Sequence, residues 1–178
     1  MSLYERENLT YTILLGHSYG GSVAGGVPDS IPTKVSALIY LDAVVPIHGK
    51  SVLNFQFDER CKSLLAQAVD HNGWHPPPSA THITLWDFDT DQQEWANANC
   101  VSQPLECFSE ASDVSGAWKL VERIAHILCT NLPLKYMDQF QFFAEQQSNW
   151  DVCQMETGHD YMVTEPTELA DILFKYVD

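Results

Sequence analysis

One short stretch near the start of the chain constrains the fold more than any other. The segment GHSYG, residues 16–20, follows an apolar run and precedes a segment rich in small residues. It fits the pattern G-x-S-x-G, in which a sharp turn from a strand into a helix holds a serine hydroxyl above the end of a sheet. Such a turn brings backbone close to the serine, so we expect glycine to be required two residues before and two residues after Ser18.

The residues around this turn predict a parallel sheet. Residues 11–15 and 35–41 are short, mostly apolar runs that contain β-branched side chains, which is typical of strands buried on both faces. Residues 20–30 predict a compact helix that Pro28 ends. A strand, a helix and a second strand in this order form a β-α-β unit, whose two strands lie parallel.

Further strands are predicted at 124–129 and 151–155, where short apolar runs recur. The last element is predicted to be a helix whose apolar face packs on the sheet, with Thr164 as the N-cap. Its apolar residues recur with helical spacing, at Leu169, Ile172, Leu173, Tyr176 and Val177.

The pattern changes between about residue 46 and residue 115, where prolines, tryptophans and acidic residues interrupt it. We interpret this segment as a cap inserted over one end of the sheet, with an amphipathic helix around 61–69. The remaining segments, 9–45 and 116–178, form the core. At 178 residues the chain is predicted to be a single domain, 1–178. Two roles stay open for the cap tryptophans, an apolar pocket or core packing: Trp74, Trp86 and Trp95.

The charge and the cysteines exclude several classes of function. A formal net charge of −15 disfavours binding to nucleic acid or to anionic membranes, because both require clusters of Lys and Arg. Five widely spaced cysteines with no C-x-x-C pair indicate neither a disulfide framework nor a zinc cluster, so we expect no metal. No secretory leader and no membrane-spanning run are recognisable, and reduced thiols suit a cytoplasmic location.

A serine nucleophile requires a base, usually a histidine, within hydrogen-bond reach. The chain has seven histidines. His159 is the strongest candidate, because it lies in a loop between the predicted strand 151–155 and the last predicted helix. That position brings it to the same end of the sheet as Ser18.

The segments GHSYGG, ALIYLDAVVP and TGHDYMVTEPTELADIL together resemble the α/β-hydrolase fold. Within that fold they are most similar to the small-ester branch, which includes plant methyl-ester esterases, hydroxynitrile lyases and bacterial esterases. The resemblance implies a partial α/β-hydrolase fold: a mostly parallel sheet with flanking helices and a cap insertion. It further implies Ser18 as nucleophile, His159 as general base, the backbone N–H of Tyr19 as an oxyanion donor, and no cofactor.

The third member of the triad departs from the family pattern. The family usually carries an aspartate shortly after the strand predicted at 124–129, where this chain has Asn131, Leu132 and Pro133. Asp138 follows, but it is expected inside the next helix. Asp42 is the better candidate, because it ends the strand next to that of Ser18. Two weaker alternatives lie near the end of the cap, Glu110 and Asp113.

The second departure lies before residue 11. Family members normally have further strands there, including the loop that donates a second oxyanion N–H, and this chain has almost none of that sequence. One edge of the strand 11–15 would then be open, and its backbone groups need partners. We therefore expect either a homodimer that covers this edge or a fragment of a longer gene product.

These observations favour a serine hydrolase that cleaves small carboxylic esters through an acyl-enzyme on Ser18. The resemblance would place a lysine after the catalytic histidine in hydroxynitrile lyases, and Asp160 stands there instead. A haloalkane dehalogenase would need an aspartate in place of Ser18. The alternative from another class is a non-catalytic, hydrolase-like domain that binds a small ligand or a protein.

Overall fold

The computed structural model describes residues 2–56, 58–78, 86–131 and 136–177. Its centre is a four-stranded sheet in which every neighbouring pair of strands runs parallel. The strands lie in the order β1 (Thr12–His17), β2 (Val35–Leu41), β5 (Arg123–Cys129) and β6 (Trp150–Met155). The parallel sheet and the approximate position of each strand predicted from the sequence are confirmed.

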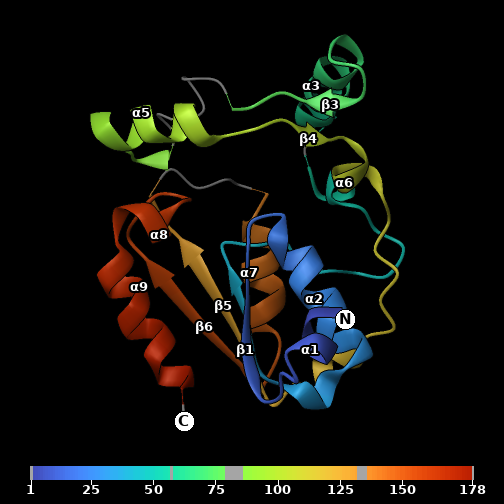
Figure 1. Ribbon diagram of the computed structural model, residues 1–178, viewed down its shortest axis with the longest axis vertical. Helices are drawn as coiled ribbons and strands as arrows, with labels where there is room; N and C mark the ends of the chain where they lie inside the picture. Colours follow the sequence, from blue (N-terminus) through green and yellow to red (C-terminus); the bar gives the residue numbers. More distant parts are fainter. Residues whose placement is uncertain (1, 57, 79–85, 132–135, 178) are drawn as a thin grey trace.

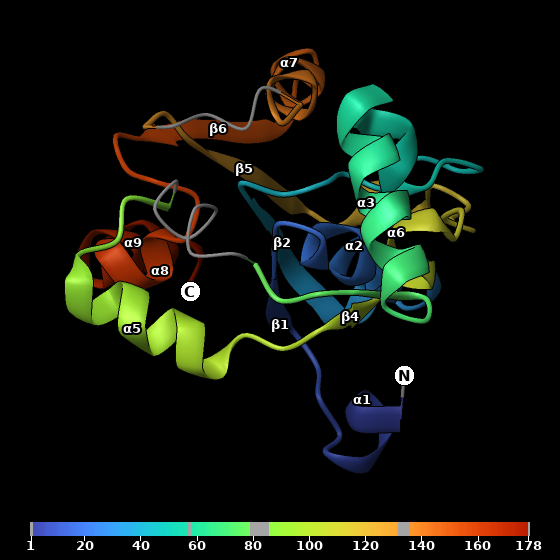
Figure 2. The same cartoon turned by 90° about the horizontal axis from the view of Figure 1, so that it is seen from above.

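Helices cover both faces of this sheet (Figure 2). Side chains of a strand alternate between the two faces, so Leu38 of β2 lies in one core cluster and Ile39 in the other. The first face packs against α2 (Gly20–Ser30) and α7 (Asp138–Glu145), and the second against α8 (Tyr161–Thr164) and α9 (Pro166–Leu173). The central strands are therefore buried on both sides, which explains their continuous apolar runs.

Two predicted helix boundaries are wrong. Helix α2 does not end at Pro28 but continues to Ser30, and the N–H of Ile31 closes its last turn on the Val27 carbonyl at 3.3 Å. Proline lacks a backbone N–H and so removes one helical hydrogen bond, and the helix continues for two further residues after Pro28. Thr164 is not the N-cap of α9 but the last residue of α8, and Glu165 is the N-cap. Pro166 dictates this, because proline suits the first helical position and disfavours helical geometry in the residue before it.

The segment predicted as a cap lies above the carboxyl ends of the strands (Figure 1). Helix α3 (Asp58–Asp70) coincides with the amphipathic helix predicted around 61–69. The cap also holds α5 (Thr90–Asn99), α6 (Glu106–Ser109) and a small antiparallel pair that the sequence did not predict, β3 (Trp74–His75) with β4 (Gln103–Pro104). The cap segment also contains the 3-10 turn η2 (Val52–Phe55). The remaining short elements outside the cap segment are α1 (Ser2–Arg6) and the 3-10 turns η1 (Pro32–Lys34), η4 (Ala117–Leu120) and η5 (Phe174–Tyr176).

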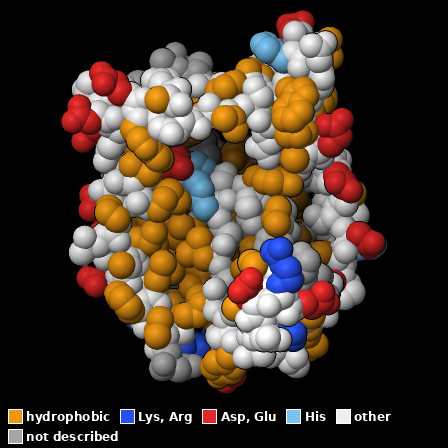
Figure 3. Space-filling model, in the orientation of Figure 1, with side chains coloured by type: hydrophobic (Ala, Val, Ile, Leu, Met, Phe, Trp, Pro, Cys, Tyr) orange, Lys and Arg blue, Asp and Glu red, His pale blue; other side chains and the backbone are white. Residues whose placement is uncertain are grey.

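Strand β1 lies at the edge of the sheet, and within the described residues only β2 pairs with it. Beside it, apolar side chains of β1 and of the C-terminal helix line a groove of about 370 Å³. We call this surface the β1 flank (Figure 3); its residues are Ile13, Leu15, Ala170, Leu173, Phe174 and Val177. Phe174 is 67% exposed and Val177 56% exposed.

The β1 flank changes one expectation about the last helix. Leu169 and Tyr176 pack into the core, as predicted, but Val177 faces solvent. The homodimer predicted to cover the edge of β1 stays a prediction, as does the cytoplasmic location. Among the described residues, no helix combines the length and the apolar character needed to cross a bilayer.

Candidate active site

Ser18 occupies the sharp turn between β1 and α2. Its φ angle is +53°, in the left-handed region that a serine seldom adopts. Hydrogen bonds hold the strained residue: its N–H donates to the Leu41 carbonyl at 3.2 Å, and its own carbonyl accepts the N–H groups of Gly21 at 3.1 Å and Val44 at 3.0 Å. The loop after β2 therefore stabilises the turn, and the serine side chain is raised above the strand ends.

The structure confirms the predicted need for glycine two residues before Ser18, at Gly16, but not two residues after it, at Gly20. A Cβ at Gly16 would lie 2.5 Å from the Gly20 carbonyl oxygen, and a Cβ at Gly21 would lie 2.3 Å from the Val44 carbonyl oxygen. A Cβ at Gly20 would meet nothing within 4 Å, so the expectation that glycine is required there is wrong. The tight backbone contacts lie behind the turn, against α2 and the loop after β2, while Gly20 faces open space.

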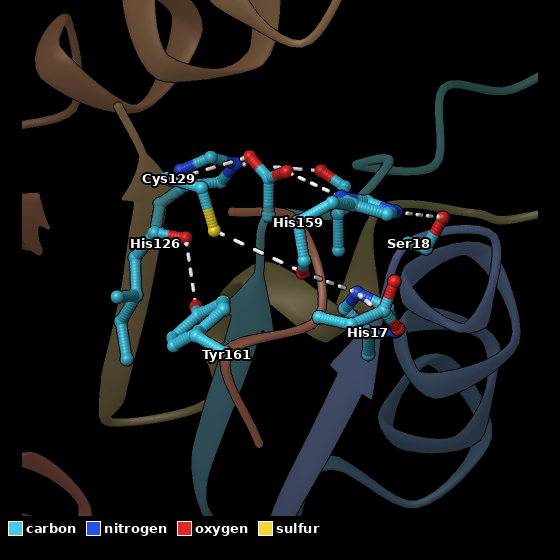
Figure 4. Close-up of polar contacts among 10 residues, drawn as sticks. His17, Ser18, His126, Cys129, His159 and Tyr161 are labelled. Carbon is cyan, nitrogen blue, oxygen red and sulfur yellow. Dashed lines mark hydrogen bonds and ion pairs between the residues drawn. The ribbon is translucent and has the colours of Figure 1, made fainter. Parts of the chain in front are cut away.

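His159 lies in the loop between β6 and α8, at the same end of the sheet as Ser18 (Figure 4). Its Nδ1 is 2.5 Å from Oδ2 of Asp42, and its Nε2 is 3.0 Å from Oγ of Ser18. A carboxylate only accepts hydrogen bonds, so Nδ1 carries the proton and Nε2 is free to accept the serine hydroxyl. The three side chains form a continuous chain of hydrogen bonds.

Asp42 directly follows β2 and is held in an unusual backbone conformation, with φ at +40°. Its N–H donates to the Ile127 carbonyl at 2.7 Å, and its Oδ1 accepts the N–H of Cys129 at 3.4 Å. The side chain is only 3% exposed, and that of His159 is 8% exposed. Such a buried carboxylate is costly unless hydrogen bonds compensate it, and here both oxygens have donors.

The other acids lie elsewhere. Glu110 and Asp113 are exposed and line a separate cavity of about 230 Å³ beside Tyr19. Asp138 is an exposed residue at the start of α7. Asn131 donates its backbone N–H to the Thr157 carbonyl at 3.0 Å and its side-chain amide to the Glu156 carbonyl at 3.1 Å. Two further residues at the place of the usual acid lie outside the described residues, Leu132 and Pro133.

Tyr19 immediately precedes α2, as its N-cap residue. In the described part of the chain its backbone N–H has no backbone acceptor. It therefore stands beside Ser18 as an available donor at the positive end of the α2 dipole. This is the environment in which a developing oxyanion is stabilised.

The cap contacts the loop of His159 directly. A Cβ at Gly158 would lie 2.3 Å from the Trp86 carbonyl oxygen, so the two backbones touch. Farther along, the Gln92 side chain of α5 donates to the Val163 carbonyl of α8 at 3.2 Å. Trp86 packs against Phe88 within the cap.

The other two cap tryptophans do not pack in the core. Trp74 is 47% exposed and Trp95 is 56% exposed, so the core-packing interpretation is wrong for both. The alternative role, an apolar pocket for the acyl or alcohol group of a substrate, stays a prediction.

Sequence reasoning missed two polar neighbours of His159. His17 donates to the His159 carbonyl, and the rings of the two histidines lie 4.5 Å apart. Asp160 lies 4.0 Å from His17, and within the described residues its buried Oδ2 has no hydrogen-bond partner. Burial raises the pKa of Asp160. The sequence offered one signal: each residue is next to a candidate catalytic residue, since His17 precedes Ser18 and Asp160 follows His159.

A family model described as the alpha/beta hydrolase family matches residues 5–172, nearly the whole chain. The chain belongs to the alpha/beta hydrolase family. It is 32% identical over 177 residues to a carbendazim-hydrolyzing esterase of Nocardioides sp. (strain SG-4G), a match that covers 95% of this chain and 72% of that protein.

Solved structures show the same fold. An extracellular alpha/beta-hydrolase from a Paenibacillus species, described as similar to tobacco salicylic acid binding protein 2, superposes with a TM-score of 0.82 at 20% identity. That match covers 98% of this chain and 75% of the other. A mutant of polyneuridine aldehyde esterase superposes with a TM-score of 0.69 at 18% identity, covering 95% of this chain and 72% of the other.

Proposed function

We propose that this chain hydrolyses small carboxylic esters through an acyl-enzyme on Ser18. The serine oxygen attacks the ester carbonyl carbon while His159 Nε2 takes the hydroxyl proton, and the Tyr19 N–H stabilises the oxyanion. The C–O bond to the alcohol then breaks, and the alcohol leaves with the proton from His159. Water, activated by the same nitrogen, releases the acid and restores Ser18.

The observation that supports this proposal most strongly is the chain of hydrogen bonds from Asp42 through His159 to Ser18, with distances of 2.5 and 3.0 Å. Asp42 fixes the proton on Nδ1 and stabilises the positive charge that His159 acquires. The named activity of the Nocardioides relative supports ester hydrolysis as the reaction class. Because that protein is named for carbendazim, carbendazim belongs among the substrates to test.

A non-catalytic, hydrolase-like binding domain is the second candidate. The open edge of β1 and the exposed apolar side chains beside it favour this alternative, since such a surface fits a polypeptide partner. The aligned nitrogen and oxygen atoms of Ser18, His159 and Asp42 count against it, because a binding domain has no need of them.

A fluorophosphonate probe, which reacts quickly only with an activated serine, separates the two candidates. We expect the wild-type chain to be labelled and to hydrolyse a short-chain p-nitrophenyl ester, and Ser18→Ala to do neither. Ser22→Ala is the matched control, because Ser22 lies one helical turn further along α2 and outside the hydrogen-bonded chain. A wild-type chain that is neither labelled nor active would support the binding domain.

A further inference from the structure

His17 is the last residue of β1 and touches His159 at two places (Figure 4). Its Nε2 lies 3.0 Å from the His159 carbonyl oxygen. Its ring lies 4.5 Å from the His159 imidazole, centre to centre, with the two planes inclined by 44°. The side chain of His17 is 24% exposed, so most of its surface is taken up by these contacts and their neighbours.

The proton on His17 can be assigned from its partner. A backbone carbonyl only accepts hydrogen bonds, so the nitrogen that faces it, Nε2, must be the donor. Burial, reinforced by the positive charge that His159 carries when protonated, lowers the pKa of His17 to about 4. His17 is therefore a neutral Nε2–H donor at the pH values at which esters are usually assayed.

The carbonyl that His17 holds belongs to a residue with little freedom to move. The imidazole of His159 must reach Asp42 with one nitrogen and Ser18 with the other, and both contacts are lost if its peptide rotates. Among the described residues, a second donor to this carbonyl is the Cys129 thiol at 3.9 Å, which is a weak hydrogen bond. His17 thus supplies the stronger restraint on the backbone of His159.

We propose that His17 is a positioning residue for the general base: its Nε2–H fixes the peptide of His159, and its ring limits the swing of the imidazole away from Ser18. This inference rests on the proposed function, because it assigns His17 a role in the same reaction. A displacement of about 1 Å in such a group can reduce the rate about 100-fold.

The neutral state of His17 matters as much as its hydrogen bond. When His159 takes the serine proton it becomes positive, and a second positive ring at 4.5 Å would oppose that step. The charged groups that face the two histidines are the carboxylates of Asp42 and Asp160. Both of these groups are acids, and a neutral His17 adds no positive charge beside His159.

Two variants separate the hydrogen bond from the ring contact. His17→Phe keeps a ring against His159 but has no donor, whereas His17→Gln places an amide N–H near the position of Nε2 but has no ring. We expect His17→Phe to lower kcat by about 10- to 100-fold, with KM changed by no more than roughly two-fold. His17→Gln should recover a large part of that loss.

Urea unfolding of the same variants provides the structural control. If His17 only stabilises the fold, both variants will lose unfolding free energy and keep the wild-type kcat, and the proposal is overturned. It is equally overturned if Phe and Gln lower kcat to the same extent, because the donor would then make no difference.

A spectroscopic readout keeps this test separate from the test of ester hydrolysis. The ¹⁵N shifts of the histidine rings should show His17 as the neutral Nε2–H form from about pH 5 to 8. The Nδ1 proton of His159, held by Asp42, should be visible far downfield in the wild-type chain, lost in His17→Phe and regained in His17→Gln. If these signals behave so while no ester is cleaved, the proposed function fails and the positioning role stands. An Nδ1–H tautomer of His17 would overturn the positioning role even in an active enzyme.

Discussion

The carboxyl end of strand β1 and its open edge contrast in how completely they are covered. At its carboxyl end, Ser18 and its partners His159 and Asp42 are packed among the ends of β2 and β5 and the loop after β6. Along its length, Ile13 and the neighbouring Phe174 of the β1 flank are exposed. The contrast teaches that the site is held by hydrogen bonds at the carboxyl end of the sheet, from β2, β5, the loop of His159 and His17 at the end of β1, rather than along the open edge of β1. Substitutions in these two regions should therefore have very different effects.

The largest effect is expected at the buried carboxylate. Asp42→Asn should reduce kcat by about 10³- to 10⁴-fold, because an amide no longer fixes the proton on Nδ1 of His159 or stabilises its positive charge. Asp138→Asn is the matched control, since Asp138 is exposed at the start of α7, and it should leave kcat unchanged. Ester hydrolysis under saturating substrate measures both. Equal rates for Asp42→Asn and the wild type would remove Asp42 from the mechanism.

The next effect concerns pH. The pKa of His17 is lowered from 6.5 to about 4, so between these values the unfolded chain binds a proton that the folded chain does not. The contribution of His17 to the free energy of unfolding is therefore present above pH 6.5, the pKa of histidine in the unfolded chain. It is lost as the pH falls, by about 2 kcal/mol between roughly pH 7 and pH 5. Urea unfolding at the two pH values should show this loss.

His17→Gln, which cannot titrate, isolates that contribution and should flatten the dependence on pH. Asp160 is unchanged in this comparison, which is necessary because its raised pKa acts in the opposite sense. An equally steep dependence in His17→Gln would assign the lost stability to other groups, among them the buried His126, whose pKa is also lowered by burial.

A smaller effect distinguishes two adjacent glycines of the turn. Gly21→Ala places a Cβ against the Val44 carbonyl oxygen and should cost about 1–3 kcal/mol of unfolding free energy. Gly20→Ala meets open space at the start of α2, and it should be neutral or raise the unfolding free energy by about 0.5 kcal/mol. Thermal or urea unfolding of the pair gives the answer. A loss at Gly20 as large as that at Gly21 would contradict the contacts described for this turn.

The smallest effect on stability is expected at the β1 flank. Phe174→Ser removes an exposed ring and should change the unfolding free energy by no more than about 0.5 kcal/mol.

The same variant tests the predicted homodimer by sedimentation velocity over a range of protein concentrations. We expect the wild-type chain to associate as concentration rises and Phe174→Ser to associate less. A wild-type monomer at every concentration would rule out a dimer over this edge.

Local sequence patterns predicted the elements that depend mainly on neighbours in the chain. The apolar runs gave the strands, and the position of Asp42 after β2 singled it out as the candidate acid. The boundary at Thr164 was wrong although its signal, Pro166, stands in the sequence and outweighs the preference of threonine for caps. The contact of His17 with His159 joins residues 142 positions apart. No local pattern reports such a contact, since only the assembled sheet brings these residues together.

The contact between Gly158 and the Trp86 carbonyl has a consequence for how this enzyme family diversifies. Gly158, which precedes His159, and the cap backbone at Trp86 are in contact, with no room for even a methyl group between them. A cap transplanted from a relative would therefore have to reproduce the path of its backbone over Gly158, however freely its other side chains vary. The rest of the cap can change its side chains, while this one backbone crossing must be kept together with the glycine before His159.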